Sequence, residues 1–468
     1  MDSTGAVLVT LVIYNAVLIG VGLWARGRNR NVEDFFLGGR GLGPWVAAIS
    51  ASASSSSAWT LLGVSGAAYA WGLPALWLFP ATVGGFLINW IWVAPRLQRL
   101  AKKEGAVTLS EVIAPSSMGG MRQLILRTAA LIIVFCFVFY IASQFEAAGK
   151  AFESVFALSK QTSILVGAGI VLAYTMVGGF WAVSVTDSIQ GILMVVAAIV
   201  LPASALIAVG GFGPLASGLA ELGNIGLPLS GCAFGLTGVF FVLGLLGIGI
   251  GYPGQPHVVN RYMALKDEKS LRQGRIIALT WAVLVYSGML LLGLCGRLLF
   301  PEFADSEQVL FRAAGFLLPP VIAGVMIAAV LSAIMSTADS QLLVASSAIS
   351  YDWHLASERP GTGLSGTRIS VVAILILATT LALVWRADIF SRVLFAFSAA
   401  GSAFGPILIM RLLGRSVSEC STLLAMLAGF GLTVAISLLP DMPGDFAERV
   451  LPFIAAGTIA WIGSQKTL

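Results

Sequence analysis

A hydrophobic stretch late in the chain carries side-chain oxygens that could bind a cation. Residues 330–348 read VLSAIMSTADSQLLVASSA, a composition apolar enough to lie in a lipid bilayer. Asp339 is unusual there, because an acidic side chain at the centre of a membrane helix costs about 2.5–3.5 kcal/mol on insertion scales and usually faces a partner, a cavity or an ion path. Positions i, i+3, i+4 and i+7 of a helix share one face. That face carries Ala333, Ser336, Thr337 and Ser340, with Ser332 and Asp339 beside it.

The type of ligand indicates the type of ion. Oxygen ligands alone suit a small, hard cation, and this stretch offers no His or Cys of the kind that a transition metal prefers. Small polar side chains also form hydrogen bonds between membrane helices, and the serines alone fit either interpretation. Asp339 favours the ion site.

The composition of the chain indicates a polytopic membrane protein. Of its 468 residues, 58% are hydrophobic and only 10% are charged, and the mean hydropathy is +0.93. Apolar runs of roughly 17–25 residues, the length that crosses the hydrocarbon core, recur along the chain. We therefore expect one membrane domain over residues 1–468 with about thirteen transmembrane helices. The expected ranges are 7–24, 44–70, 74–95, 124–149, 161–184, 188–209, 233–257, 275–299, 312–350, 367–386, 389–412, 420–439 and 448–464.

The basic residues predict how the chain crosses the membrane. With the amino terminus outside and the carboxyl terminus in the cytoplasm, most Lys and Arg fall in short cytoplasmic loops, as the positive-inside rule requires. The first apolar run has no basic region before it, so we interpret it as a retained helix in the plasma (inner) membrane. The net charge of +5 is spread over these loops without an aromatic-interleaved patch, which argues against nucleic acid as a partner. The dispersed cysteines, Cys136, Cys232, Cys295 and Cys420, predict packing residues rather than a disulfide framework or a zinc site.

Two apolar segments contain residues that weaken a regular helix. Residues 49–59 read ISASASSSSAW, and residues 244–256 hold five glycines and two prolines. Gly lowers helix propensity by about 1 kcal/mol and Pro by about 3, and Ser competes for backbone hydrogen bonds. Broken helices at matching positions of two halves are typical of a transporter binding site, since the freed carbonyls need protein or a watery cavity beside them. The segments lie five predicted helices apart, an odd number, which predicts inverted repeats over residues 44–209 and 233–412. Close helix packing by the glycines and a hydrogen-bonding face for the serines are the alternatives.

Several multi-residue motifs occur in order along the chain. They are DFFLGGR (34–40), Trp59, YTMVGGF (174–180) with Thr186 and Asp187, GQPH (254–257) with RYMA (261–264), and MST (335–337) with SQLL (340–343). On these motifs the chain resembles the sodium:solute symporter family, especially its sodium/proline symporters, almost from end to end. The resemblance implies an all-α membrane fold with a five-plus-five inverted repeat and two broken helices, as in leucine-type transporters. Residues 1–40 would then form the first helix and loop, and residues 413–468 the accessory helices.

The resemblance also implies two cation sites. A sodium ion would lie between the first broken helix and the helix that carries the Ser–Thr pair. Its ligands would be the backbone carbonyls of Ala53, Ser56 and Ala333 and the hydroxyls of Ser336 and Thr337. Some relatives hold a second cation, which here would involve Asp187, Asp339 and Ser340 together with Ser336.

Two of the acidic residues have simpler interpretations. Asp187 follows the expected helix 161–184 and starts the next one, so a helix cap near the cytoplasmic surface is the alternative to a cation ligand. Glu146 has Lys150 four residues later, which predicts an ion pair along one helix.

The resemblance implies a solute site that differs from that of proline symporters. Matching polar and aromatic positions are present as Ser57, Tyr140, Tyr252 and Pro256. Four positions are altered: Ser55 replaces an aspartate, Ile248 replaces a tryptophan, Ala58 replaces a glycine, and Ser56 replaces a methionine. Loss of the carboxylate and of the indole changes the charge and the apolar surface of the cavity.

The function we expect is sodium-coupled symport of a small organic solute, proline or a related amino acid, by alternating access. The alternatives are a symporter of another solute, such as a carboxylate or a vitamin acid, a carrier driven by protons through Asp187 and Asp339, and a sensor that binds solute without moving it. An enzyme is not expected, because His257 and His354 are placed near membrane edges and no nucleophile–base pair or phosphate-binding loop is present. We expect sodium as the transported coupling ion and no organic cofactor. The oligomeric state stays open, a monomer included.

Overall fold

The computed structural model describes residues 3–25, 37–114, 119–156, 158–222, 235–300, 305–355, 363–385, 388–440 and 442–466. Cys232, residues 34–36 of the first motif and the side chains of residues 174–179 lie outside this description. Cys136 and Cys295 are buried and free, as expected of packing residues, whereas Cys420 is exposed.

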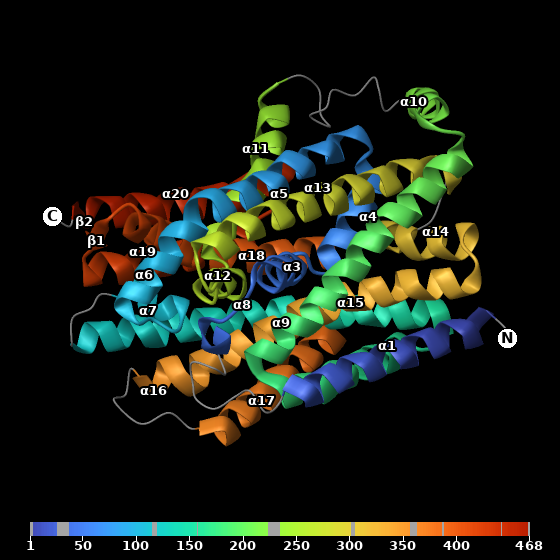
Figure 1. Cartoon of the computed structure of the whole chain (residues 1–468). Coiled ribbons are helices and arrows are strands. Elements are labelled where there is room, and N and C mark those ends of the chain that lie inside the picture. Colours follow the sequence, from blue (N-terminus) through green and yellow to red (C-terminus); the bar gives the residue numbers. More distant parts are fainter. Residues whose placement is uncertain are drawn as a thin grey trace.

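The described chain is almost entirely helical (Figure 1). Its first half forms α1 (Ser3–Ala25), η2 (Gly38–Arg40), α3 (Pro44–Ser55), the π-helical η3 (Trp59–Gly63), α4 (Val64–Trp71), η4 (Leu73–Trp77), α5 (Leu78–Leu87), η5 (Ile88–Val93), α6 (Ala94–Glu104), α7 (Leu109–Ile113), α8 (Gly120–Phe156), α9 (Lys160–Val209) and α10 (Phe212–Glu221). Its second half forms α11 (Leu236–Ile250), η6 (Tyr252–Gly254), α12 (Pro256–Met263), α13 (Glu268–Leu299), η7 (Ser306–Gln308), α14 (Val309–Leu317), α15 (Pro320–Ser347), η8 (Ala348–Asp352), α16 (Trp353–Leu355), α17 (Gly363–Val384), α18 (Ile389–Leu412), β1 (Arg415–Val417), α19 (Glu419–Ile436), η9 (Pro443–Asp445), α20 (Phe446–Ile462) and β2 (Ser464–Lys466). The two strands pair antiparallel, with Ser416 opposite Gln465.

Membrane-spanning helices dominate the fold. Within the described residues, nine helical stretches are long and apolar enough to cross a bilayer, and residues 7–21 and 160–172 form shorter apolar helices. The stretches that contain α15 and α18 are the most buried, at 83% and 89% of their apolar windows, whereas α19 is only 28% buried. The first two therefore lie at the centre of the bundle and α19 at its edge. The count of about thirteen spans and the division into two inverted repeats stay predictions.

Both predicted helix interruptions are confirmed. The first helix stops at Ser55, Ser56 takes a non-helical backbone (φ −118°, ψ 64°), and the chain becomes helical again at η3. The second helix stops at Ile250, passes through the turn η6 and an extended Gln255, and restarts at α12 with Pro256 in its first turn. Proline fits this position because it lacks the N–H that a first turn leaves without a helical partner. Both interruptions are buried inside the bundle.

Glycine allows the second interruption to approach its neighbours closely. A Cβ on Gly254 would lie 2.6 Å from the carbonyl oxygen of Gly401 in α18, and one on Gly85 in α5 would lie 2.3 Å from the ring of Tyr252. Both separations are far below normal contact, so only glycine fits. The interruption is thus held between α5 and α18.

The helix boundary expected at Asp187 is wrong. Helical structure continues through this residue, which lies inside the span Phe180–Val209. The hydroxyls of Ser184, Thr186 and Ser188 each donate to a carbonyl four residues earlier and so follow the local helix. Asp187 therefore has no helix end to cap, and its charge is satisfied by other helices.

Candidate functional site: a buried polar centre between the broken helices

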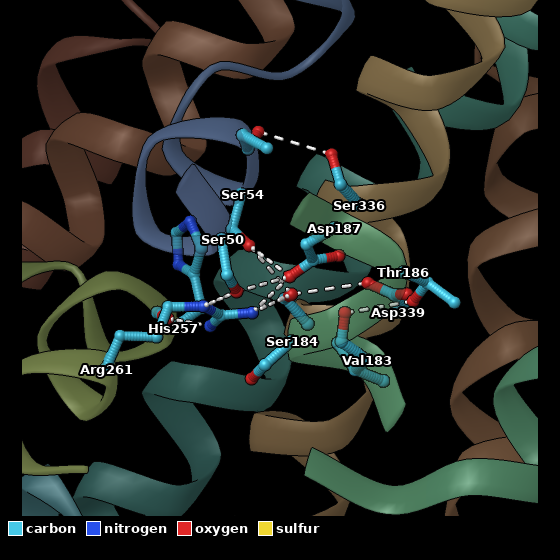
Figure 2. A network of polar contacts seen from close by, with 12 residues as sticks. Ser50, Ser54, Val183, Ser184, Thr186, Asp187, His257, Arg261, Ser336 and Asp339 are labelled. Atoms are coloured by element: carbon cyan, nitrogen blue, oxygen red, sulfur yellow. Dashed lines mark hydrogen bonds and ion pairs between the residues drawn. The ribbon is translucent and has the colours of Figure 1, made fainter. Parts of the chain in front are cut away.

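The end of α3 meets α15 through the residues expected to bind sodium. Ser336 Oγ donates to the carbonyl of Ala53 at 3.3 Å, and Thr337 Oγ1 donates to the carbonyl of Ser54 at 3.1 Å. All four residues are completely buried. Figure 2 shows Ser336 on its own helix facing the neighbouring segment of α3. Two hydroxyls and two carbonyls at a helix end thus form one group of oxygens, as a small hard cation requires.

The other expected sodium ligands lie at the same place but have different partners. The carbonyl of Ala333 accepts from Ser336 Oγ at 3.3 Å, within α15. Ser56 sits at the break itself and pairs through its hydroxyl with the hydroxyl of Tyr286 in α13, at 3.3 Å. The carbonyl that meets Thr337 belongs to Ser54, which we did not expect as a ligand. The sequence shows that Ser54 lies in the serine run, but it does not predict how α3 is rotated about its axis and therefore which carbonyl faces α15.

A second polar network lies one helical turn further along α15 (Figure 2). Asp187 Oδ2 accepts from Ser50 Oγ at 2.7 Å, from Ser54 Oγ at 3.1 Å and from Arg261 Nη2 at 2.8 Å. Ser54 Oγ also lies 3.0 Å from Ser340 Oγ. Ser54 therefore belongs to both centres, with its carbonyl in the first and its hydroxyl in the second.

The structure brings together three of the residues expected for a second cation and adds one that was not expected. Ser340 Oγ donates to Asp339 Oδ1 at 3.2 Å, and Arg261 donates to Ser340. Arg261 comes from α12 and is 1% exposed. In the sequence it was part of the RYMA motif, but nothing in its spacing indicated that it pairs with Asp187, 74 residues earlier.

The residues expected around the solute surround the first break. Tyr140 OH, from α8, donates to Ser57 Oγ at 3.2 Å. The backbone N–H of Ala58 donates to Gln144 Oε1 at 3.0 Å, one turn further along α8. Ser57 Oγ in turn accepts the N–H of Trp59 at 3.2 Å and so helps to restart the helix. Ser55, where proline symporters have an aspartate, donates to the carbonyl of Ser52 in its own helix.

Tyr286 in α13 joins the two breaks and was missed from the sequence. Its hydroxyl lies 3.2–3.3 Å from those of Ser56, Thr60 and Tyr252. An isolated Tyr in an apolar helix carries no sequence signal that separates packing from a polar role. Four hydroxyls from three chain segments therefore converge at one point.

Ile248 and Pro256 flank the second break on either side of Tyr252, buried in the last turn of α11 and the first turn of α12. His257, expected near a membrane edge, is instead 1% exposed, with its ring edge-on to Phe137 and 6.2 Å from the ring centre of Tyr140. The error has a physical cause: the break turns α12 inward, so the residues after Pro256 enter the bundle.

At the end of the bundle where α1 begins, five charged side chains form ion pairs, and all of them except Lys160 are largely buried. Glu146 contacts Arg392 at 2.9 Å and Lys160 at 2.5 Å, and Lys150 contacts Glu307 at 2.6 Å. The expected pair of Glu146 with Lys150 is therefore wrong, because each residue finds a partner on another element. Burial raises the pKa of Glu307 above its usual range, although Lys150 acts in the opposite direction.

A cavity of about 580 Å³ opens among these charges. At its base Phe390 packs against Trp59 and Trp71, with ring centres 5.6 and 5.2 Å apart. Trp59 lies two residues beyond Ser57. Phe390, which lines the cavity, thus contacts a ring that closely follows the hydroxyls of the first break in the chain. Its lining includes Gly63, Trp71, Glu146, Lys150, Glu307 and Phe390.

At the opposite end, backbone hydrogen bonds join the two halves of the chain. Leu42 donates to the carbonyl of Ala264 and accepts from the N–H of Lys266, both at 3.2 Å. Gln98 in α6 donates to the carbonyl of Leu265 at 2.8 Å. These bonds join the segment before α3, α6 and the connection between α12 and α13. These contacts hold the two halves of the chain together at this end, which we call the closed end.

Comparisons with known proteins agree on one class of transporter. The sodium:solute symporter family model matches residues 35–429. The high-affinity proline transporter PutP of Bacillus subtilis (strain 168) is 33% identical over 94% of this chain and 93% of its own length. The sodium/proline symporter of Escherichia coli (strain K12) is 34% identical over 92% of this chain and 87% of its own length. A substrate-bound, outward-open Na⁺-coupled sialic acid symporter has the same fold, with a TM-score of 0.83 and 17% identity over 99% of both chains.

Proposed function

Because this chain belongs to the sodium:solute symporter family, we propose that it carries proline across the plasma membrane together with sodium. The chain is an integral membrane transporter with a helical fold shared with other sodium-coupled carriers. The relatives named for proline cover most of this chain at about one-third identity, which favours proline over other small solutes.

The meeting of α3 with α15 is the observation that carries the proposal. Ser336 and Thr337 direct hydroxyls at the carbonyls of Ala53 and Ser54, on the last turn before the break. A sodium ion would replace these weak hydrogen bonds with ion–oxygen contacts and hold the two helices together. One elementary charge that crosses the membrane potential gains about 2.3 kcal/mol per 100 mV, which can drive uphill accumulation of a solute.

The hydroxyls of Ser57, Tyr140, Tyr252 and Tyr286 provide a neutral polar surface next to this sodium position. A zwitterion such as proline suits that surface, since its carboxylate would lie toward the sodium and its ring against the aromatic side chains. Ile248 and Ala58, which differ from proline symporters, would set the shape of the apolar wall.

We assign the cavity end to the outside and the end with α6 and the α12–α13 connection to the cytoplasm. Lys and Arg residues are frequent at the latter end, as the positive-inside rule requires. With this orientation the amino terminus lies outside, the carboxyl terminus inside, and the closed end faces the cytoplasm. The conformation is then outward-facing, with Phe390 and Trp59 between the entrance and the solute.

The test is uptake of ¹⁴C-proline by proteoliposomes that hold the purified chain. An inward sodium gradient should drive concentrative uptake, and replacement of sodium by choline at constant pH and ionic strength should abolish it. A proton gradient imposed without sodium is the second arm, since it tests coupling through the acidic residues. A panel of other amino acids and of carboxylates, added as unlabelled competitors, tests the solute. Uptake that is the same with and without sodium would contradict the proposal. So would inhibition of uptake by an unlabelled carboxylate but not by unlabelled proline.

A further inference from the structure

The oxygens of the second network surround a cation that the chain itself supplies. Arg261 Nη2 donates to Asp187 Oδ2 and to Ser340 Oγ, and Arg261 Nε donates to Ser50 Oγ at 2.8 Å. The carboxylate is completely buried and the arginine side chain is 1% exposed. Figure 2 shows the guanidinium beside the carboxylate, with the serines of α3 around it. The positive group thus occupies the centre of the oxygen set, not its edge.

A guanidinium in this position competes with a metal ion. Arginine stays protonated in proteins, so its positive charge compensates the charge of Asp187 for as long as the two side chains are paired. Its N–H groups also use lone pairs of Asp187, Ser50 and Ser340 that a metal ion would need. Two positive charges within a few ångströms of each other in a buried site repel strongly, so the guanidinium disfavours a sodium ion at Asp187 even though the carboxylate of Asp339 accepts from Ser340 in the same network.

The same site would suit sodium once the guanidinium was removed. Asp187 Oδ1 has no hydrogen-bond partner among the residues that the structure describes. The hydroxyls of Ser50, Ser54 and Ser340 already lie around the other carboxylate oxygen and each other. A carboxylate with several hydroxyls is a ligand set that a small hard cation prefers.

On the basis of the proposed sodium symport, we propose that Arg261 is the resident cation of the Asp187 site. The wild-type chain therefore carries one sodium ion per solute, bound at the Ser336–Thr337 centre. Substitution Arg261→Gln opens a second sodium site at Asp187. Arg261 is in this sense a determinant of ion stoichiometry.

Two measurements on the full-length purified chain test this inference. The first counts ²²Na⁺ and ¹⁴C-proline taken up together by proteoliposomes with wild-type protein, and the second counts ²²Na⁺ bound at equilibrium to detergent-solubilised protein. For wild type we expect one sodium per proline and one bound ion per chain. For Arg261→Gln we expect two bound ions per chain and a Hill coefficient for sodium that rises from one toward two. Two sodium ions per proline in the wild type, or one bound ion in a folded Arg261→Gln variant, would overturn the inference.

Matched variants separate this effect from general damage. Arg392→Gln removes another buried arginine from a carboxylate, Glu146, at the opposite end of the bundle, and should leave one bound sodium. The double variant Asp187→Asn/Arg261→Gln removes both charges and should also return to one. If Arg261→Gln fails to fold, the ratio of sodium to proline taken up by the wild-type chain still tests the inference, since a ratio of two would overturn it. Because equilibrium ²²Na⁺ binding needs no solute, a failure of proline uptake alone would reject the proposed solute and leave the ion count intact.

Discussion

The double substitution Ser336→Ala/Thr337→Val removes both hydroxyls from the proposed sodium centre and retains the shape of α15. Each hydroxyl lies 3.1–3.3 Å from a carbonyl at the end of α3, close enough for one ion to contact both helices. Hydrogen bonds to charged groups are worth about 1.5–3 kcal/mol each, and contacts of a hydroxyl with an ion are of similar size. Loss of two contacts therefore costs about 3–6 kcal/mol, which corresponds to roughly a 100- to 20,000-fold rise in the sodium concentration for half-maximal uptake.

The assay is the initial rate of ¹⁴C-proline uptake by proteoliposomes against external sodium, with choline keeping the ionic strength constant. Ser346→Ala/Ser347→Ala is the matched control, since these buried serines lie on the same helix but donate to its own carbonyls, those of Leu343 and Val344, at 2.8 Å. The control should stay within about threefold of wild type, because such back-bonding contributes little to helix stability. A double variant of Ser336 and Thr337 that folds, reaches the membrane and keeps the wild-type sodium dependence would refute the assignment.

Two further substitutions test the solute surface and the second break. Tyr140→Phe removes the hydroxyl that donates to Ser57. Loss of one hydrogen bond, worth about 0.5–1.5 kcal/mol, should raise the apparent KM for proline roughly 2- to 12-fold at saturating sodium. A drop in maximal rate at constant KM would instead indicate that Tyr140 only packs. Gly254→Ala places a methyl group 2.6 Å from the carbonyl oxygen of Gly401 and should lower the melting temperature of the solubilised protein. Gly84→Ala is the control, since the space around its Cβ position is open, and it should leave the melting temperature unchanged. Equal melting temperatures for the two variants would contradict the close approach.

The broken helices and the Ser–Thr pair could be predicted because their signals are local. A serine run, or five glycines and two prolines in thirteen residues, disfavours a regular helix whatever surrounds it. The face that carries Ser336 and Thr337 follows from helical spacing alone. Their place beside the first break came from family resemblance; the structure has both hydroxyls in contact with that segment, and the sodium site itself stays a prediction.

The errors arose where long-range packing decides. Asp187 was interpreted as a possible cap because charged residues in apolar sequence often mark helix ends, but a buried arginine from α12 lets the helix continue. Glu146 was paired with Lys150 by spacing along the helix, yet each finds a partner that packs from elsewhere. Tyr286 gave no signal at all, since its role depends on the point where two breaks and α13 meet.

The backbone pairing of Leu42 with the α12–α13 connection makes the opening of this end measurable by hydrogen exchange. An amide hydrogen held in such a bond exchanges with deuterated solvent only during the intervals when the bond is open. The N–H groups of Leu42 and Lys266 must both be released before the closed end can part. The rate of deuterium uptake at these two amides therefore reports how often the chain opens toward the opposite conformation. A sodium ion that holds α3 against α15 should lower this rate.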